Sequence, residues 1–378
     1  MKKVLFLCLS LFFIFFTVSG CKKEDSVTIT FSSWGSASEI AALKPVLEKF
    51  EKNNPGIKVE FLHFPQNYFQ KIHLLFASNT APDVIFINNL NLPLYADFLE
   101  DLSDKFNTEP FYQKTLEVLS YKNKLLAIPR DISNLVIYYN KDIFDKHNIP
   151  YPKSDWTFDD LINICKKLKE KNTFCLSYDE GTMYLLPFLM SNGAGILSDD
   201  LKNELYNDDV VQEGINFYKD MRYKHHFAPT KSESATSTMA QMFLNKKIAM
   251  HLSGRWIVPK YREAADFNWN VINFPNGKKG SIVSADASGW ALNKNSKHKK
   301  EALQLIEFLA SEESILSFSN SGLIVPARID VAESPAFLNG KPENSVTFIK
   351  VIKTSKKTPV SKDYKKLTDK IDKMLSFE

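Results

Sequence analysis

The sequence predicts an α/β protein with doubly wound, parallel-stranded sheets in two domains. Three observations predict this class. The chain has 378 residues, about twice the usual size of one domain. Residues 27–87 alternate strand, helix, strand, helix and strand, the order that builds a parallel sheet. No long linker divides the chain, so two domains would require the chain to cross between them more than once.

The predicted elements follow from the spacing of apolar residues. We expect strands over 27–31, 57–62 and 84–87, separated by helices near 40–50 and 69–76. Apolar residues recur every three or four positions in both helices, as on one buried helix face. The third strand (VIFI) is apolar throughout, which is typical of a parallel sheet covered on both faces. Later strands are expected over 135–139, 248–253, 269–274 and 287–293, and later helices over 158–171 (N-cap Thr157), 209–223, 237–244 and 299–311.

The N-terminus is predicted to be a lipoprotein signal peptide over 1–20, followed by a polar tether over 21–25. Two lysines precede an apolar run over 4–18, which is shorter than the roughly 20 residues of a membrane span and fits a secretory signal. Small residues then precede Cys21, in an order that resembles a bacterial lipobox. We expect lipid on Cys21 to anchor the mature chain outside the cytoplasmic membrane, on the periplasmic side or at the cell surface. The alternative is an ordinary signal peptide with an unmodified cysteine.

Charge and cysteine content narrow the classes of partner. A net charge of +4 is too balanced for a protein whose affinity depends on phosphate backbones, so we expect no nucleic-acid partner. Of the four cysteines, Cys8 leaves with the signal and Cys21 carries lipid. Cys165 and Cys175 remain. They could form a disulfide or stay as two buried free thiols, and the sequence leaves both alternatives open. The seven histidines are scattered, and we expect neither a metal nor a cofactor.

Candidate ligand contacts follow the ends of the predicted strands, where open parallel sheets bind ligands. Trp34, Trp256 and Trp290 lie there beside glycines, whereas Trp156 and Trp269 are assigned to the cores. Aromatic faces stack on the apolar faces of sugar rings, and planar amide, carboxylate and guanidinium groups bind hydroxyls. The sequence therefore favours a saccharide ligand.

Catalytic motifs are absent from the sequence. It contains no G-x-S-x-G, Walker A or H-E-x-x-H pattern. Asp131 and Asp286 are the remaining pair of carboxylates that a glycoside hydrolase could use. Aspartates at a binding site also simply accept hydroxyl protons, so the favoured hypothesis is a protein without enzymatic activity.

Seven segments, taken in order behind the lipobox, resemble a known family over nearly all of the mature chain. They are VTITFSSWG (27–35), FEKNNPGIKV (50–59), APDVIF (81–86), KLLAIPRDISNLVIYYNKDIF (124–144), WTFDDL (156–161), MFLNKKIAMHLSGRW (242–256) and SGWAL (288–292). This pattern resembles the extracellular solute-binding proteins of ABC importers, family 1, the group related to maltodextrin-binding protein. Ile87 stands where maltodextrin binders have a tryptophan, so maltose is not assigned.

The resemblance implies two doubly wound lobes, a hinge of several crossing segments, and a ligand cleft between the lobes. Crossings are expected near 130–134, 284–287 and 325–328. Lobe one is then 26–131 with 286–325, and lobe two is 132–285 with 326–378. By position, Trp256 matches an aromatic that stacks on sugar, and the loop 178–183 matches one that contacts ligand from lobe two. The predicted ligand-binding residues are Trp34, Ser36, Asn88, Arg130, Asp131, Tyr178, Trp256, Asp286 and Trp290.

The predicted function is that of a membrane-anchored receptor. The receptor is expected to be a monomer. It captures a mono- or oligosaccharide and delivers this ligand to the permease of an ABC importer. One alternative is a binder of a phosphorylated polyol, such as a glycerophosphodiester, with Arg130 as the phosphate partner. Another is a lipid-anchored glycoside hydrolase that uses Asp131 and Asp286.

Overall fold

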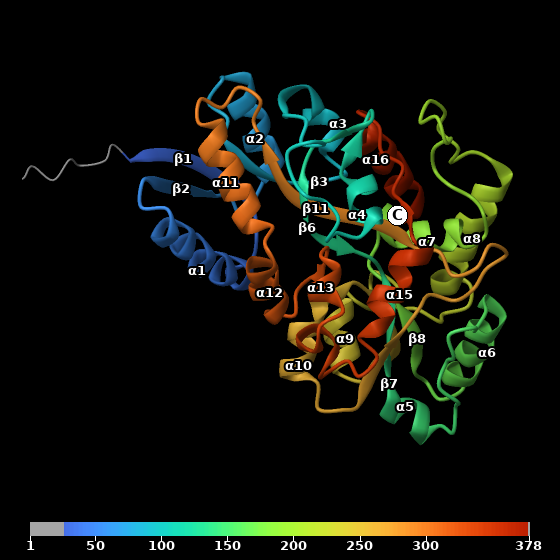
Figure 1. Cartoon of the computed structure of the whole chain (residues 1–378). Helices are drawn as coiled ribbons and strands as arrows, with labels where there is room; N and C mark the ends of the chain where they lie inside the picture. The colour runs from blue at the N-terminus through green and yellow to red at the C-terminus, as the bar shows by residue number, and fades with distance from the viewer. Residues whose placement is uncertain (1–25, 377–378) are drawn as a thin grey trace, which may run out of the picture.

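Two β-sheets form the frameworks of two lobes in the computed structural model, which describes residues 26–376 (Figure 1). The predicted signal peptide, the tether and Cys21 lie outside the described residues. The first sheet has strand order β12-β6-β11-β3-β1-β2, with β13 paired to β11, and the second has order β10-β7-β9-β8. A short hairpin pairs β4 with β5. The two-lobed α/β class predicted from the sequence is confirmed.

The strands have the following bounds. They are β1 (Val27–Ser33), β2 (Ile57–His63), β3 (Val84–Asn88), β4 (Ser120–Tyr121), β5 (Lys124–Leu125), β6 (Ile128–Ser133), β7 (Val136–Asn140), β8 (Phe174–Ser177), β9 (Ile248–Ser253), β10 (Trp269–Ile272), β11 (Ser284–Leu292), β12 (Val325–Pro326) and β13 (Lys356–Lys357).

The helices have the following bounds. They are α1 (Ala37–Asn53), α2 (Tyr68–Ala77), α3 (Leu92–Tyr95), α4 (Gln113–Val118), α5 (Lys141–Lys146), α6 (Phe158–Lys169), α7 (Thr182–Met190), α8 (Asp209–Tyr223), α9 (Met239–Leu244), α10 (Val258–Ala264), α11 (Lys299–Leu309), α12 (Glu312–Asn320), α13 (Ile329–Ala332), α14 (Pro335–Leu338), α15 (Val346–Thr354) and α16 (Tyr364–Leu375), with the short 3₁₀ helices η1 (Ala96–Phe98) and η2 (Arg255–Ile257).

The first sheet is mixed rather than wholly parallel. Strands β1, β2 and β3 pair in parallel, as their alternation with helices predicts. Strand β11 runs antiparallel to both β3 and β6. In the second sheet only β8 and β9 are parallel. Strands β7 and β11 pair antiparallel with their neighbours because the chain reaches each of them from the other lobe, and not from a helix packed on the same sheet.

The chain passes between the two sheets at several places. It leaves the first sheet with β6 and enters the second with β7, and it returns between β10 and β11. After β12 the segment up to α15 reaches the second sheet, where the backbone N–H of Asn344 donates to Asn270 Oδ1 at 3.0 Å. These passages lie close to the predicted crossings, while the residue boundaries of the lobes stay a prediction.

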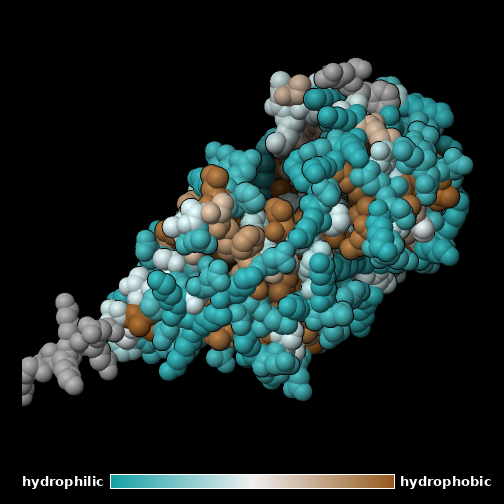
Figure 2. All heavy atoms as spheres, turned by 90° about the horizontal axis from the view of Figure 1, so that it is seen from above, coloured by the Kyte–Doolittle hydropathy of each residue, from teal (hydrophilic) through white to brown (hydrophobic). Residues whose placement is uncertain are grey.

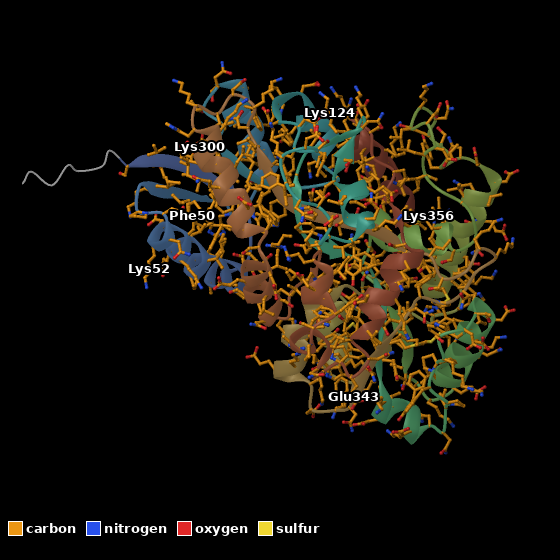
Figure 3. The ribbon with its side chains drawn as sticks, viewed as in Figure 1. Phe50, Lys52, Lys124, Lys300, Glu343 and Lys356 are labelled. Atoms are coloured by element: carbon orange, nitrogen blue, oxygen red, sulfur yellow. A yellow bond between two sulfur atoms is a disulfide. The ribbon has the colours of Figure 1, made fainter. Side chains whose placement is uncertain are left out.

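Helices cover both sheets and bury their apolar sides. In lobe one, α1 contacts α11 and α12, and the Phe50 and Phe308 rings lie 5.6 Å apart between them. Figure 3 shows Phe50 between these elements, while Lys52, Lys124 and Lys300 lie on the exposed periphery. From above, most of the visible surface is hydrophilic, with apolar side chains gathered near its middle (Figure 2).

In lobe two, a disulfide and a helix cap fix α6. Thr157 Oγ1 accepts a hydrogen bond from the backbone N–H of Asp160 at 3.2 Å, which confirms the predicted N-cap. Cys165 on α6 is disulfide-bonded to Cys175 on β8, so the structure takes the first of the two alternatives left open by the sequence. Among residues 26–376, no helix has the length and apolar character needed to cross a membrane.

Candidate functional site

A cavity of about 170 Å³ is lined by residues of β6 and β11 in the first sheet and by the turn after β9 of the second. It brings together four predicted site residues: Trp34, Arg130, Asp131 and Trp256. Residues that the sequence analysis missed also line it, among them Glu39, Ser133, Arg255 and Ser288. Because residues of both lobes line this cavity, it is the candidate ligand site.

A larger cavity of about 800 Å³ lies elsewhere, between α4, residues 190–205 and residues 356–360. None of the predicted site residues lines it, and its one aromatic lining residue is Tyr121. We favour the smaller cavity because two tryptophans line it, which suits recognition of a ring.

Trp34 forms one wall of the cavity from lobe one. It follows the end of β1, and Gly35 after it has φ 141°, a conformation that favours glycine. The indole is half-buried, with its ring centroid 4.4 Å from Phe86 and 5.1 Å from Tyr68. These rings hold the indole in place, so that its remaining surface lies at the cavity.

Arg130 and Asp131 form an ion pair within the cavity wall. Arg130 Nε donates to Asp131 Oδ2 at 2.6 Å, and Arg130 Nη2 lies 3.7 Å from Glu39 Oε1. The guanidinium also lies over the Phe86 ring at 4.3 Å. Burial raises the pKa of Asp131, although the neighbouring Arg130 opposes that shift. Two carboxylates, those of Asp131 and Glu39, already neutralise the Arg130 guanidinium, so it attracts a ligand phosphate only weakly.

Trp256 lines the cavity from lobe two. It lies just past the end of β9, in the turn formed by η2, and is 36% exposed. A Cβ atom on Gly254 would lie 1.9 Å from Trp256 Cζ3, so only glycine allows the indole to fold back over the chain at this place. The Tyr138 hydroxyl donates to the Gly254 carbonyl at 2.8 Å. The turn is thereby tied to the second sheet.

Three other predicted residues lie outside the lining of this cavity. Ser36 is the N-cap of α1, where its hydroxyl and the Glu39 carboxylate form a capping box. Asn88 Oδ1 accepts from the backbone and side-chain nitrogens of Asn91 at 3.1 and 2.8 Å. Asp286 Oδ1 accepts from Asn89 Nδ2 at 2.9 Å, and burial raises the pKa of Asp286. Each of these side chains has a partner that accounts for its position in the fold.

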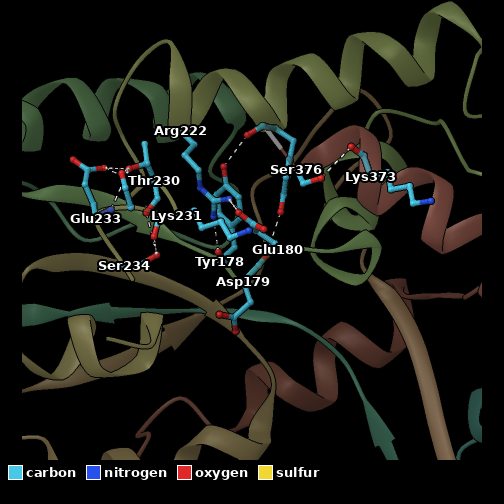
Figure 4. Close-up of polar contacts among 12 residues, drawn as sticks. Tyr178, Asp179, Glu180, Arg222, Thr230, Lys231, Glu233, Ser234, Lys373 and Ser376 are labelled. Carbon is cyan, nitrogen blue, oxygen red and sulfur yellow. Dashed lines mark hydrogen bonds and ion pairs between the residues drawn. The ribbon is translucent and has the colours of Figure 1, made fainter. Parts of the chain in front are cut away.

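The prediction that Tyr178 and Trp290 present their rings to ligand is wrong. Tyr178 is fully buried in lobe two, where its hydroxyl donates to the Tyr218 carbonyl at 2.7 Å and its ring lies beneath Arg222 (Figure 4). Trp290 is 1% exposed, with Phe86 and Phe318 on either side of its ring. Trp290 lies inside β11 and not beyond its end, so its side chain packs into the core of lobe one.

Two predicted core tryptophans lie where we expect them, since Trp156 and Trp269 are both buried. Arg255 also lines the cavity but is not among the predicted ligand-binding residues, although it stands between Gly254 and Trp256 in the GRW segment. Within residues 26–376, His, Cys, Asp and Glu side chains form no group of three that could hold a metal ion.

Comparisons with known proteins identify the family. Residues 34–315, about three quarters of the chain, match the family described as bacterial extracellular solute-binding protein. The galactooligosaccharide-binding protein of Bacillus subtilis is 22% identical over 357 residues, which cover 88% of this chain and 82% of the relative. The multiple sugar-binding protein of Streptococcus mutans is 22% identical over 347 residues, with 85% and 78% covered.

Solved structures agree on the fold. An ABC substrate-binding protein from Listeria monocytogenes, in complex with cycloalternan, has a TM-score of 0.83 at 24% identity over 93% of each chain. The GacH receptor of Streptomyces glaucescens, solved unliganded and with acarbose, has a TM-score of 0.81 at 20% identity over 93% of this chain and 92% of its own. On the family match and the shared fold, this chain belongs to the bacterial extracellular solute-binding proteins.

Proposed function

We propose that this chain is the receptor of an ABC importer and captures a saccharide between its two lobes. The observation that carries the proposal is the cavity that Trp34 lines from one lobe and Trp256 from the other. Two indoles can enclose a sugar ring, and the serines and the carboxylate of Asp131 can bind its hydroxyls. The names of the relatives, which bind galactooligosaccharides or several sugars, support this class of ligand.

Binding is proposed to close the lobes, because a ligand that touches both walls stabilises the closed arrangement over the open one. The hinge is proposed to consist of the segments near 130–134, 284–287 and 325–328, with the lobe boundaries given above. Contacts at Ser36, Asn88 and Asp286 would require a ligand long enough to extend beyond the cavity.

The experiment that tests this function is calorimetric titration of the purified protein with a panel of neutral and acidic oligosaccharides. At least one should bind with measurable heat and raise the melting temperature, since a ligand that binds only the folded state stabilises it. Trp269→Phe, a change in the buried core of lobe two, is the control that should bind like the wild type. If no saccharide of the panel binds to a folded protein, the proposed ligand class is wrong.

We also propose that binding occurs without catalysis. Asp131 is engaged by Arg130, and Asp286 is engaged by Asn89, so neither carboxylate is free in the way that a glycosidase nucleophile is. After prolonged incubation with the protein, a bound oligosaccharide should be recovered at its original mass. Shortened products that disappear in Asp131→Asn would establish a hydrolase instead.

Lipid on Cys21 is proposed to keep this receptor at the outer side of the cytoplasmic membrane, next to its permease. The Cys21→Ala variant should then leave the membrane fraction, because it has no thiol to carry the acyl chains that anchor the protein. Cys8→Ala, within the predicted signal peptide, is the matched control and should stay with the membrane. Equal release of both variants would argue against lipid at Cys21.

A further inference from the structure

Arg255 is a buried arginine of the candidate site that has no acidic partner among residues 26–376. Arg255 is among the residues that line the cavity, and it is 3% exposed. Its guanidinium lies between the Phe337 and Phe348 rings, at 4.2 and 5.0 Å from their centroids. Nη1 donates to Ser345 Oγ at 3.3 Å, and the buried Nε has no hydrogen-bond acceptor within residues 26–376.

The other arginines in the wall or the core of this chain have a carboxylate. Arg222, 2% exposed, lies 3.4 Å from Glu180 and also donates to the Tyr178 carbonyl at 2.8 Å (Figure 4). Arg130 has Asp131, and Arg328 has Asp330. In the described part of the chain, no carboxylate lies within 4.0 Å of the Arg255 guanidinium.

Such an arrangement is costly unless something compensates it. A buried charge is normally paired or neutralised. Burial lowers the pKa of Arg255 only to about 10, so the group stays cationic at neutral pH. Contact with two aromatic faces offsets part of the cost. The rings attract the cation but do not accept several directed hydrogen bonds, so the Nε–H group of Arg255 stays without an acceptor among residues 26–376.

On these grounds we propose that Arg255 binds an anionic group of the saccharide, either a uronate carboxylate or a sugar phosphate. This inference rests on the proposed function and names the class of sugar. A guanidinium binds a carboxylate or phosphate through paired, charge-assisted hydrogen bonds. The neighbouring Trp256 is placed to stack on the same ligand. Arg130 holds the two carboxylates of the cavity, Asp131 and Glu39, which reduces their repulsion of an anion.

The test compares three probes of equal length on the purified full chain: a neutral galactooligosaccharide, an oligogalacturonate and a galactooligosaccharide that carries one phosphate. We expect at least one acidic probe to bind about tenfold or more tightly than the neutral one. Its affinity should fall between about 0.05 and about 0.5 M NaCl, whereas that of the neutral probe should stay unchanged. The tighter of the two acidic probes identifies the anionic group.

Substitutions then assign the effect to one side chain. Arg255→Gln, which keeps hydrogen-bond donors but removes the charge, should cost the acidic probe about tenfold and the neutral probe less than about threefold. Arg255→Lys should retain the salt dependence with weaker binding. Arg262→Gln, at an exposed arginine outside the cavity lining, is the control and should bind all probes like the wild type.

Two outcomes separate the inference from the function on which it rests. If the wild type binds the neutral probe as tightly as both acidic ones, or if Arg255→Gln weakens all probes equally, Arg255 is a structural side chain and the inference is wrong. Should Arg255→Gln fail to fold, the preference and salt dependence of the wild type decide alone. If none of the three probes nor any other saccharide binds the wild type, the proposed function itself fails.

Discussion

Trp256 and Trp290 look alike in the sequence and differ entirely in the structure. Each stands close behind a glycine, and each is a predicted ligand contact. Trp256 is 36% exposed at the wall of the cavity, whereas Trp290 is 1% exposed in the core of lobe one. The difference arises from their place along a strand. Trp256 lies past the end of β9, while Trp290 lies within β11.

This contrast shows which part of the sequence reasoning was sound. The strand expected over 287–293 already includes Trp290. Successive side chains of a strand point to opposite faces of the sheet, so a residue inside it is placed by the packing of helices on that face. A glycine before a tryptophan therefore indicates a close backbone approach and does not by itself indicate ligand access.

The two glycines differ in the same way. A Cβ on Gly289 would lie 2.2 Å from the Ile128 carbonyl oxygen on β6, whereas a Cβ on Gly254 would meet the Trp256 ring. Gly289 thus permits two strands to approach at the irregular register between Ser288 and Gly289. Gly254 permits one side chain to lie flat. Substitutions at all four positions can separate a structural role from a binding role.

The largest effect is expected for Trp290→Ala. Removal of this buried indole from between Phe86 and Phe318 should lower the free energy of unfolding by about 3–5 kcal/mol, because a cavity remains in the core. Urea denaturation measures the change. Trp256→Ala is the matched control and should change stability by less than about 1 kcal/mol. Equal losses in the two variants would contradict the contrast between them.

Gly289→Ala should come next. The added methyl group clashes with the backbone of β6, and we expect a loss of about 1–3 kcal/mol in unfolding free energy. Gly56→Ala, where a Cβ would meet no atom within 4 Å, is the control in the same denaturation experiment. A Gly289→Ala protein as stable as the control would mean that β6 and β11 can separate at no cost.

Trp256→Ala should act on binding and leave the fold intact. Loss of the stacking surface should weaken saccharide binding by about tenfold or more, equivalent to ~1.4 kcal/mol. Calorimetric titration of wild type and variant with the best saccharide of the panel measures it. Unchanged affinity in a folded variant would remove Trp256 from the site.

Gly254→Ala should give the smallest effect of the four. The methyl group displaces the Trp256 ring without removing it, so we expect an affinity loss of about three- to tenfold, with stability within about 1 kcal/mol of the wild type. The same titration, with Gly56→Ala again as the control, provides the check. A loss larger than that of Trp256→Ala would show that Gly254 acts by another route.

Much of the fold could be predicted because its signals are local. The apolar run of β3 and the Thr157 cap each depend on residues that are neighbours in the sequence. Helix α7 and the direction of the Tyr178 ring do not depend on neighbouring residues alone. Tyr178 turns inward because Arg222 and Tyr218 on α8 hold it from about 40 positions away, and no local pattern contains that contact.

The candidate site was predicted in part for the same reason. The expected strand ends selected Trp34, Arg130, Asp131 and Trp256, which line one cavity, but also Asn88, Asp286 and Trp290, which do not. Arg255 was missed because its importance lies in what surrounds it: the Phe337 and Phe348 rings come from segments about 80 and 90 positions later in the chain. The absence of an acidic partner is visible only once those segments have folded against it.

The most direct test of the central claim is a crystal structure of the protein with a bound saccharide from the panel. We predict a sugar ring stacked on Trp256, inside the cavity that Trp34 and Arg130 also line. A saccharide bound instead in the larger cavity between α4 and residues 190–205, with Trp256 free of ligand, would contradict it.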